Sequence, residues 1–145
     1  MIAIGADHGG FKLKEELKAH YKGELKDFGT YDETRGLEEP KVALAVAEAV
    51  ANGECEAGIL ICRSGIGMAM TANKVKKIRC ALCYNNETAL SAKQHNNANV
   101  IALGADFVTL SEAIERIEIW KNAKFLEGIY GERLDIVEEY EKEKE

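Results

Sequence analysis

The stretch AGILICRSGIGMAMTANK, residues 57–74, decides the fold. It starts as an apolar run, ends that run in Cys62, turns through Ser64, Gly65 and Gly67, and continues with the period of a helix. A strand that enters a helix through small residues leaves the first helical N–H groups aimed past the carboxyl end of the strand. The stretch therefore predicts a strand–turn–helix unit that holds the Cys62 thiol beside anion-stabilising amides.

The Cys62 side chain is the first candidate for chemistry. The helix dipole and the loop amides would favour its thiolate, which is the reactive form of a cysteine. A base and an anion-binding loop would then share one turn of the chain. A cysteine at the end of an apolar strand also fits a purely structural role, because free cysteine packs as a small hydrophobe.

Composition narrows the class of protein. The 145 residues fit one domain that can bury a hydrophobic core without disulfides or a structural metal. With 19 basic against 25 acidic residues the net charge is −6, and the basic residues form no long stripe, so we expect no nucleic acid partner. A small soluble molecule is the expected partner.

The sequence also bears on location. No apolar run reaches 18 residues, so we expect no membrane span and no membrane partner. Residues 1–6 are too short, and too quickly followed by Asp7 and His8, to form a signal peptide. We therefore expect a cytoplasmic protein whose four cysteines stay reduced.

Short apolar strands alternate with helix-period segments along the chain, which is typical of a parallel sheet covered by helices on both faces. This pattern predicts an α/β fold, a Rossmann-like three-layer α/β/α sandwich with a five-stranded parallel sheet. Residues 1–145 are expected to form a single domain. The expected strands are residues 1–6, 24–28, 57–62, 79–83 and 99–103.

The expected helices lie between these strands and after them. Two early helices contain residues 13–21 and 42–50, and three later ones cover residues 67–75, 87–96 and 110–124. A last helix, at about residues 131–145, ends in a charged run that most simply is a solvated terminus. Its apolar stripe suits packing against a partner subunit and consists of Leu134, Ile136, Val137 and Tyr140.

Open sheets of this kind bind ligands at the carboxyl ends of the strands, near the point where the strand order reverses. Asp7 and His8 follow the first expected strand, residues 62–67 end the third, and Asn85 and Asn86 follow the fourth. We expect these residues to share one edge of the sheet. Asp7 also suits a cap of the first helix.

His95 lies elsewhere, at the end of the fourth expected helix and just before the fifth strand. That position is at the opposite edge of the sheet, so His95 would be far from Cys62 within one subunit. A symmetric dimer would bring the partner's His95 across to Cys62. From its position alone, His95 equally suits a helix C-cap.

Spacing excludes several familiar sites. No GxxxxGK[ST] loop is present, and the third glycine of a dinucleotide fingerprint that began at Gly65 and Gly67 would be Met70. Cys80 and Cys83 form a CxxC, but within a strand they would point to opposite faces and could not share one metal. We therefore expect no nucleotide chemistry and give these two cysteines a packing role.

Four segments carry a resemblance to a known family. They are GADHGGFKLKEEL (residues 5–17), DFGTY (27–31), GILICRSGIGMAMTANK (58–74) and HNNANVIALG (95–104). In this order, over nearly the whole chain, they resemble the family of ribose-5-phosphate isomerase type B and galactose-6-phosphate isomerase. The resemblance implies a Rossmann-like fold and a homodimer that can pair into a tetramer. It also implies interconversion of an aldose phosphate and its ketose without metal or cofactor.

The resemblance also implies roles for single residues. Cys62 resembles the general base that moves a proton between C1 and C2, and His95 resembles the proton donor that opens the sugar ring across the dimer interface. A group that titrates near neutrality suits ring opening. The expected substrate-binding residues are Asp7, His8, Arg63, Ser64, Gly65, Ile66, Gly67, Asn96 and Arg133.

The chain departs from the family pattern around the phosphate site. Of three phosphate-binding arginines that the resemblance implies, only Arg133 is kept; Ile129 and Asp106 take the other two positions, and Tyr130 replaces a histidine. Each charge-assisted bond to a phosphate contributes about 1.5–3 kcal/mol to binding. The loss of two arginines therefore weakens the case for ribose 5-phosphate as the substrate.

Other departures offer replacements. The family has glycine and threonine after the cysteine and a Tyr-Pro pair after the second strand, whereas this chain has Arg63-Ser64 and Glu39-Pro40. New positive charge for a pentose or hexose phosphate can come from Arg63, Lys41 or Arg35. Arg63 can equally be a solvated loop residue.

Two rival functions stay open at this point. The missing arginines fit a sugar-phosphate binding protein without turnover. The other rival is one subunit of a hetero-oligomeric galactose-6-phosphate isomerase, in which two related chains cooperate. The presence of both Cys62 and His95 favours an active isomerase.

Overall fold

The computed structural model describes residues 1–30 and 37–144. Its strands form a parallel sheet in the order β2-β1-β3-β5-β4. The prediction of a five-stranded parallel sheet is confirmed. The strands are β1 Ile2–Ala6, β2 Leu25–Asp27, β3 Ala57–Cys62, β4 Cys80–Leu82 and β5 Val100–Gly104.

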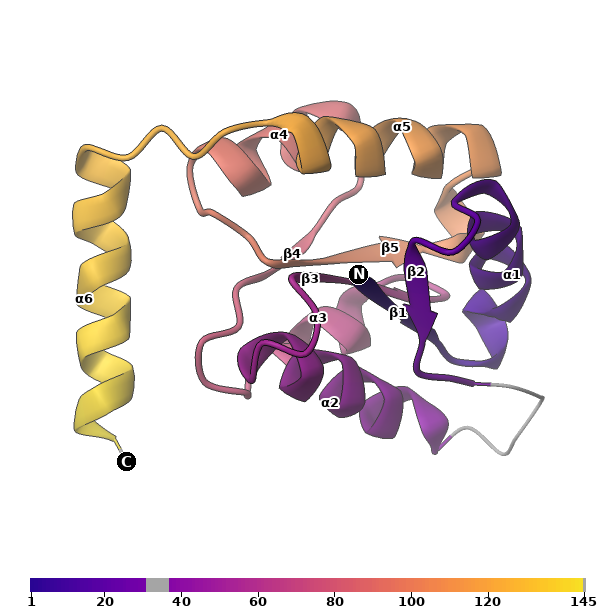
Figure 1. Cartoon of the computed structure of the whole chain (residues 1–145), viewed down its shortest axis with the longest axis horizontal. Coiled ribbons are helices and arrows are strands. Elements are labelled where there is room, and N and C mark those ends of the chain that lie inside the picture. Colours follow the sequence, from indigo (N-terminus) through magenta and orange to yellow (C-terminus); the bar gives the residue numbers. More distant parts are fainter. Residues whose placement is uncertain (31–36, 145) are drawn as a thin grey trace.

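Helices cover both faces of the sheet, so the predicted three-layer sandwich is confirmed (Figure 1). One face carries α1 Phe11–His20, α4 Asn86–Gln94 and α5 Leu110–Asn122. The other face carries α2 Glu38–Ala51 and α3 Ile66–Ala72. Among residues 1–30 and 37–144, no helix has the length and apolarity needed to cross a bilayer.

Alternation along the central strands divides the core into two halves. In β3, Ile59 and Ile61 pack on the side of α1, α4 and α5, while Leu60 and Cys62 pack on the side of α2 and α3. Every residue of β1 and β5 is buried. Burial on both faces explains why these strands read as continuous apolar runs in the sequence.

The CxxC cysteines lie on different sides of the sheet, as expected for positions three apart in a strand. Cys83 belongs to the half of the core under α4 and α5, and Cys80 packs against the other half. Burial raises the pKa of each thiol to about 12. Both cysteines therefore act as small packing residues, in agreement with the sequence-based interpretation.

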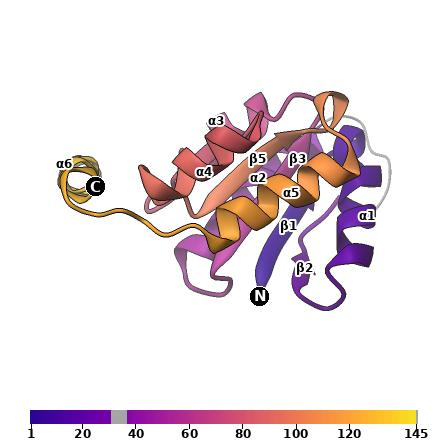
Figure 2. The same ribbon diagram turned by 90° about the horizontal axis from the view of Figure 1, so that it is seen from above.

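The last helix, α6, stands apart from the three layers (Figure 2). It spans Ile129–Glu143 and so starts slightly before the expected residue 131. None of its described residues is buried, and Ile136 is 72 % exposed. An amphipathic helix of this kind needs another surface to cover its apolar stripe.

Candidate functional site

The carboxyl ends of β1, β3 and β5 meet at one edge of the sheet. Ala6 pairs with Ile61, and Cys62 pairs with Gly104, so the residues that follow these strands are neighbours. The backbone N–H of Asp7 donates to the carbonyl of Ile61 at 3.2 Å. The strand order reverses between β1 and β3, which is where open sheets bind ligands.

The Cys62 thiol lies at this edge, on the side of α2 and α3. Its Sγ accepts a hydrogen bond from the backbone N–H of Gly65 at 3.1 Å. Cys62 is buried, with 6 % of its surface exposed, and the Gly65 amide is a donor aimed at its sulfur. The predicted thiol beside a loop amide is present in the structure.

Gly65 makes this contact through an unusual backbone. It caps α3 with φ +83°, a left-handed conformation that favours glycine. A Cβ at this position would come within 2.6 Å of Leu82 Cδ1. In the same loop, Ser64 Oγ accepts from the backbone N–H of Ile66 at 3.2 Å, so the hydroxyl supports the turn.

Asp7 and His8 are held by specific partners at the same edge. Asp7 Oδ1 accepts from the N–H of Gly10 at 3.1 Å, so it caps the 3₁₀ turn His8–Gly10 that leads into α1. His8 Nδ1 donates to Glu38 Oε1 at 2.8 Å. Because Nδ1 is engaged, Nε2 is the ring nitrogen available to a ligand.

Glu39 is a third carboxyl at this edge, after Asp7 and Glu38, and it was not among the site residues expected from the sequence. Its Oε1 accepts from the Thr71 hydroxyl at 3.5 Å and would lie 3.0 Å from a Cβ at Gly67. Burial, together with the charge of Asp7, raises the pKa of Glu39. The sequence signal was the replacement of a family tyrosine by Glu39, but its position over the loop is a tertiary contact.

Arg63 lies at the mouth of the loop. Its Nη1 is 3.8 Å from Asp106 Oδ2, and its side chain is 68 % exposed. Its Cγ would meet a Cβ at Gly9 at 2.6 Å, so the glycine leaves room for the arginine stem. Asp106 therefore faces the new positive charge that Arg63 adds. Lys41 is exposed on α2, and Arg35 lies outside the described residues.

Asn85 and Asn86 follow β4 but make helix-end contacts. Asn85 caps α4, because its Oδ1 accepts from the N–H of Thr88 at 2.7 Å. Asn86 donates to Glu115 of α5. Both asparagines therefore have a structural role.

The remaining expected site residues form a second group at the amino end of the sheet. His95 is the C-cap of α4, and its ring stacks on Tyr130 of α6 with centroids 4.5 Å apart. Asn96 follows and is exposed, while the Arg133 guanidinium carbon lies 5.6 Å from the Tyr130 ring centroid. Because β5 begins only at Val100, this group and Cys62 lie at opposite ends of the strands.

The structure thus divides the expected site into two halves within one chain. Asp7, His8 and residues 62–67 lie together, and His95, Asn96 and Arg133 lie apart from them. This agrees with the sequence-based expectation that His95 is remote from Cys62 in one subunit.

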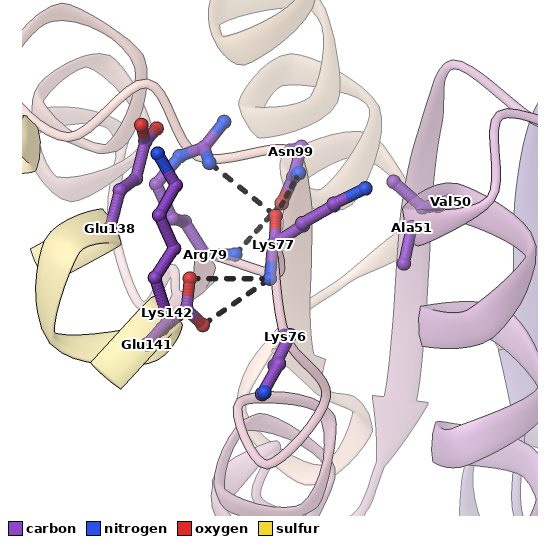
Figure 3. A pocket seen from close by; sticks show the side chains of 9 residues that line it. All are labelled: Val50, Ala51, Lys76, Lys77, Arg79, Asn99, Glu138, Glu141 and Lys142. Atoms are coloured by element: carbon purple, nitrogen blue, oxygen red, sulfur yellow. Dashed lines mark hydrogen bonds between the residues drawn. The ribbon is translucent and has the colours of Figure 1, made fainter. Parts of the chain in front are cut away.

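A pocket of about 450 Å³ lies between α6 and the body of the protein (Figure 3). Glu141 on α6 accepts from the backbone N–H of Lys77 at 3.3 Å, and Arg79 and Asn99 both donate to the Lys77 carbonyl. Neither Cys62 nor His95 lines this pocket. It is the space left between α6 and the three layers, separate from both halves of the candidate site.

Comparison with known proteins relates this geometry to a family. Residues 2–137 match the sequence model described as Ribose/Galactose Isomerase. The chain is 40% identical over 139 residues to ribose-5-phosphate isomerase B of Escherichia coli, covering 94% of this chain and 93% of that protein. It is 38% identical over 128 residues to the galactose-6-phosphate isomerase subunit LacB of Clostridium acetobutylicum, covering 86% and 73%.

A solved structure agrees with the sequence matches. Ribose-5-phosphate isomerase B of Mycoplasma genitalium with bound ribulose-5-phosphate superposes with a TM-score of 0.91 at 39% identity, covering 98% of this chain and 96% of that one. The family model and both relatives span most of the chain. The protein belongs to the ribose/galactose isomerase family.

Proposed function

We propose that the protein interconverts an aldose phosphate and its ketose through an enediolate, with Cys62 as the base. Family membership makes the protein a sugar-phosphate isomerase. The observation that carries the assignment of the base is the 3.1 Å contact from the Gly65 N–H to Cys62 Sγ at the ligand-binding edge. This contact holds a sulfur that is buried but still lies at the rim of the sheet.

The proposed proton transfers follow from this placement. The Cys62 thiolate takes the proton from C2 of the aldose, and the electron pair moves to the carbonyl oxygen O1. The thiol returns its proton to C1 while the proton of the O2 hydroxyl passes to O1, which gives the ketose. Amides of the 63–67 loop other than those of Gly65 and Ile66, which already donate to Cys62 and Ser64, stabilise the enediolate, because preorganised donors act most strongly where charge develops. Asp7 and His8 bind the sugar.

His95 is the proposed proton donor for ring opening, and it acts on the site of the partner subunit. One chain cannot supply both groups, since His95 precedes β5 and Cys62 ends β3. A two-fold dimer exchanges the missing half between subunits. The exposed stripe of α6 supports this assembly, with α6 as an arm of a single isomerase domain. Two such dimers can pair into a tetramer.

The phosphate is proposed to bind between Arg63 of one subunit and Arg133 of the other. Arg133 occupies one of the three positions where the resemblance implies a phosphate-binding arginine. The carboxylate of Asp106 lies near Arg63 and partly offsets its positive charge. The proposed substrate is a phosphorylated pentose or hexose, either ribose 5-phosphate or a related sugar phosphate that this changed set of cations binds. We infer a reducing compartment, the cytoplasm, because Cys62 has to remain a free thiol.

A second candidate is one subunit of a hetero-oligomeric isomerase. The likeness to the LacB subunit and the loss of two arginines favour it. The mass of the purified protein in solution and its turnover without added chains separate the two cases. A self-sufficient dimer that turns over sugar phosphate excludes the paired-subunit function.

The test of the proposed function is turnover by a Cys62→Ala variant. Assays with pentose 5-phosphates and hexose 6-phosphates first identify the substrate of the parent protein. In the variant, kcat should fall by about 10²- to 10⁴-fold while sugar-phosphate binding changes little, because only the transition state needs the base.

The matched control is Cys55→Ala, which removes another buried thiol, remote from the edge that holds Cys62. It should keep the parent kcat. Parent turnover in the Cys62 variant would assign the base to another residue. Binding of sugar phosphates with no turnover of any of them would identify a binding protein.

A further inference from the structure

His95 does not stand alone at the end of α4. Its imidazole lies against the ring of Tyr130, with the two planes 10° from parallel and their centroids 4.5 Å apart. Tyr130 belongs to the first turn of α6, which starts at Ile129. Two elements that are distant in sequence therefore meet at the side chain proposed to open the sugar ring.

A backbone contact fixes this meeting point. The N–H of Leu126 donates to the carbonyl of Gln94, the last residue of α4, at 3.0 Å. The segment before α6 is thereby tied to the residue that precedes His95. At its other end, α6 touches the body through Glu141 and the backbone of Lys77 (Figure 3). Tyr130 thus approaches His95 on an element that is held at both ends.

Face-to-face stacking has a specific consequence for an imidazole. The ring nitrogens donate and accept in the plane of the ring, so a neighbour on the face leaves both nitrogen edges free for a sugar oxygen. The same neighbour removes side-chain rotations that would swing the imidazole out of that plane. The contact orients His95 without using its hydrogen-bonding groups.

We infer that Tyr130 is a positioning residue for the reaction, whose ring face holds the His95 imidazole in the orientation that reaches the partner subunit's site. The inference rests on the proposed function of His95. The guanidinium carbon of Arg133, one turn further along α6, lies 5.6 Å from the centroid of the same ring, but the inference concerns the contact with His95 alone. The hydroxyl of Tyr130 takes no part.

The experiment compares Tyr130→Phe and Tyr130→Leu, alone and combined with His95→Gln, on the cyclic sugar phosphate that the parent turns over fastest. Tyr130→Phe keeps the ring face and should retain the parent kcat/KM. Tyr130→Leu should lower kcat/KM by about 10- to 100-fold, the scale expected for a misplaced catalytic group. In the His95→Gln background, Tyr130→Leu should cost less than about twofold, because the group it positions is gone.

The control is Tyr84→Leu, which removes an exposed tyrosine from the loop before α4 and should leave kcat/KM unchanged. Equal losses from Tyr130→Leu with and without His95 would overturn the inference. Loss of the solution dimer in Tyr130→Leu would overturn it too, by making Tyr130 an assembly residue. Parent activity in His95→Gln would instead refute the proposed role of His95, so the two failures are distinguishable.

Discussion

At the scale of single residues, the site depends on a backbone conformation that few side chains allow. Gly65 adopts φ +83° and directs its N–H to Cys62 Sγ. The space beside its Cα is already filled by Leu82 and the backbone of Leu103. The hydrogen bond to the Cys62 thiol therefore depends on residue 65, three positions later, having no side chain.

Gly65→Ala tests this dependence. The substitution should destabilise the protein by about 2 kcal/mol or more, because a left-handed alanine costs about 1–2 kcal/mol and its Cβ would also lie 2.6 Å from Leu82. Activity should fall as well, since the amide moves away from the thiol. Denaturant unfolding and kcat measure the two effects.

Gly53→Ala is the matched control. Gly53 has φ +84°, but no atom lies within 4 Å of the position of an added Cβ. Stability should therefore fall only by the cost of the left-handed backbone conformation, and activity should be unchanged. Equal losses of stability at both glycines would show that the crowding at Gly65 is unimportant.

Glu39 gives a second prediction at this scale. Its pKa is raised in the folded protein by burial and by Asp7, so folding favours the neutral form. The ionised side chain then opposes folding above its folded pKa. Glu39→Gln should stabilise the protein by less than about 1 kcal/mol at neutral pH, given partial exposure, and the gain should vanish as pH falls below 4.5.

Thermal melts from pH 3.5 to 8 measure this effect. Glu48→Gln, on the exposed side of the same helix, is the control and should show no such pH-dependent gain. A stabilisation by Glu39→Gln that is equally large at acidic and neutral pH would contradict the account.

At the scale of elements, most of the architecture follows from local pattern. The runs 57–62 and 99–103 read as strands because both of their faces are buried, and they match β3 and β5 closely. The helices follow their apolar periodicity, and the glycines of residues 65–67 mark the turn. The fold and the placement of Cys62 were therefore predictable.

The contacts that could not be predicted are those between distant segments. Glu38 holds His8, Glu39 lies over Gly67, and Tyr130 stacks on His95. Each pair is at least 28 positions apart in the sequence. Spacing rules describe neighbours on one strand or helix, so they carry no information on such pairs.

Lys14 joins two elements and provides a prediction at this scale. Its Nζ is fully buried and donates to both Asp27 carboxylate oxygens at 2.8 Å and to the Thr30 carbonyl at 2.7 Å, which ties α1 to the end of β2. Burial opposes ionisation of Asp27, but the hydrogen bonds from Lys14 and Lys18 outweigh it and lower the Asp27 pKa.

Lys14→Met should destabilise the protein by about 3–5 kcal/mol at neutral pH, because it removes one partner of a buried charge pair. Since the Asp27 pKa is lowered on folding, its stabilisation is present above 3.8 and is lost as pH falls through the folded value. The variant should therefore lose less stability on acidification than the parent. Urea unfolding at pH 7 and pH 3 measures both.

Lys18→Met is the control for this pair. Lys18 also donates to Asp27, at 2.7 Å, but its side chain is 33 % exposed. Its replacement should therefore lower the free energy of unfolding by less than about 1 kcal/mol. Equal costs for the two lysines would show that burial of Lys14 adds nothing to the strength of the contact.

At the scale of the whole molecule, the parallel sheet separates the chemistry. Cys62 lies where β3 ends, and His95 lies before β5 begins. Parallel strands place those two positions at opposite edges of the sheet, irrespective of the loop conformations. An activity that needs both groups in one site therefore requires two chains, and α6 with its exposed apolar residues is the element that can join them.

The most direct test of this central claim is complementation between two variants of strongly reduced activity. Cys62→Ala and His95→Gln homodimers each lack one group in every site. After subunit exchange in an equal mixture, mixed dimers should hold one site with both groups intact, so about a quarter of the parent activity should appear. Mixed dimers that form, as shown by mass, yet remain inactive would contradict a site shared between subunits.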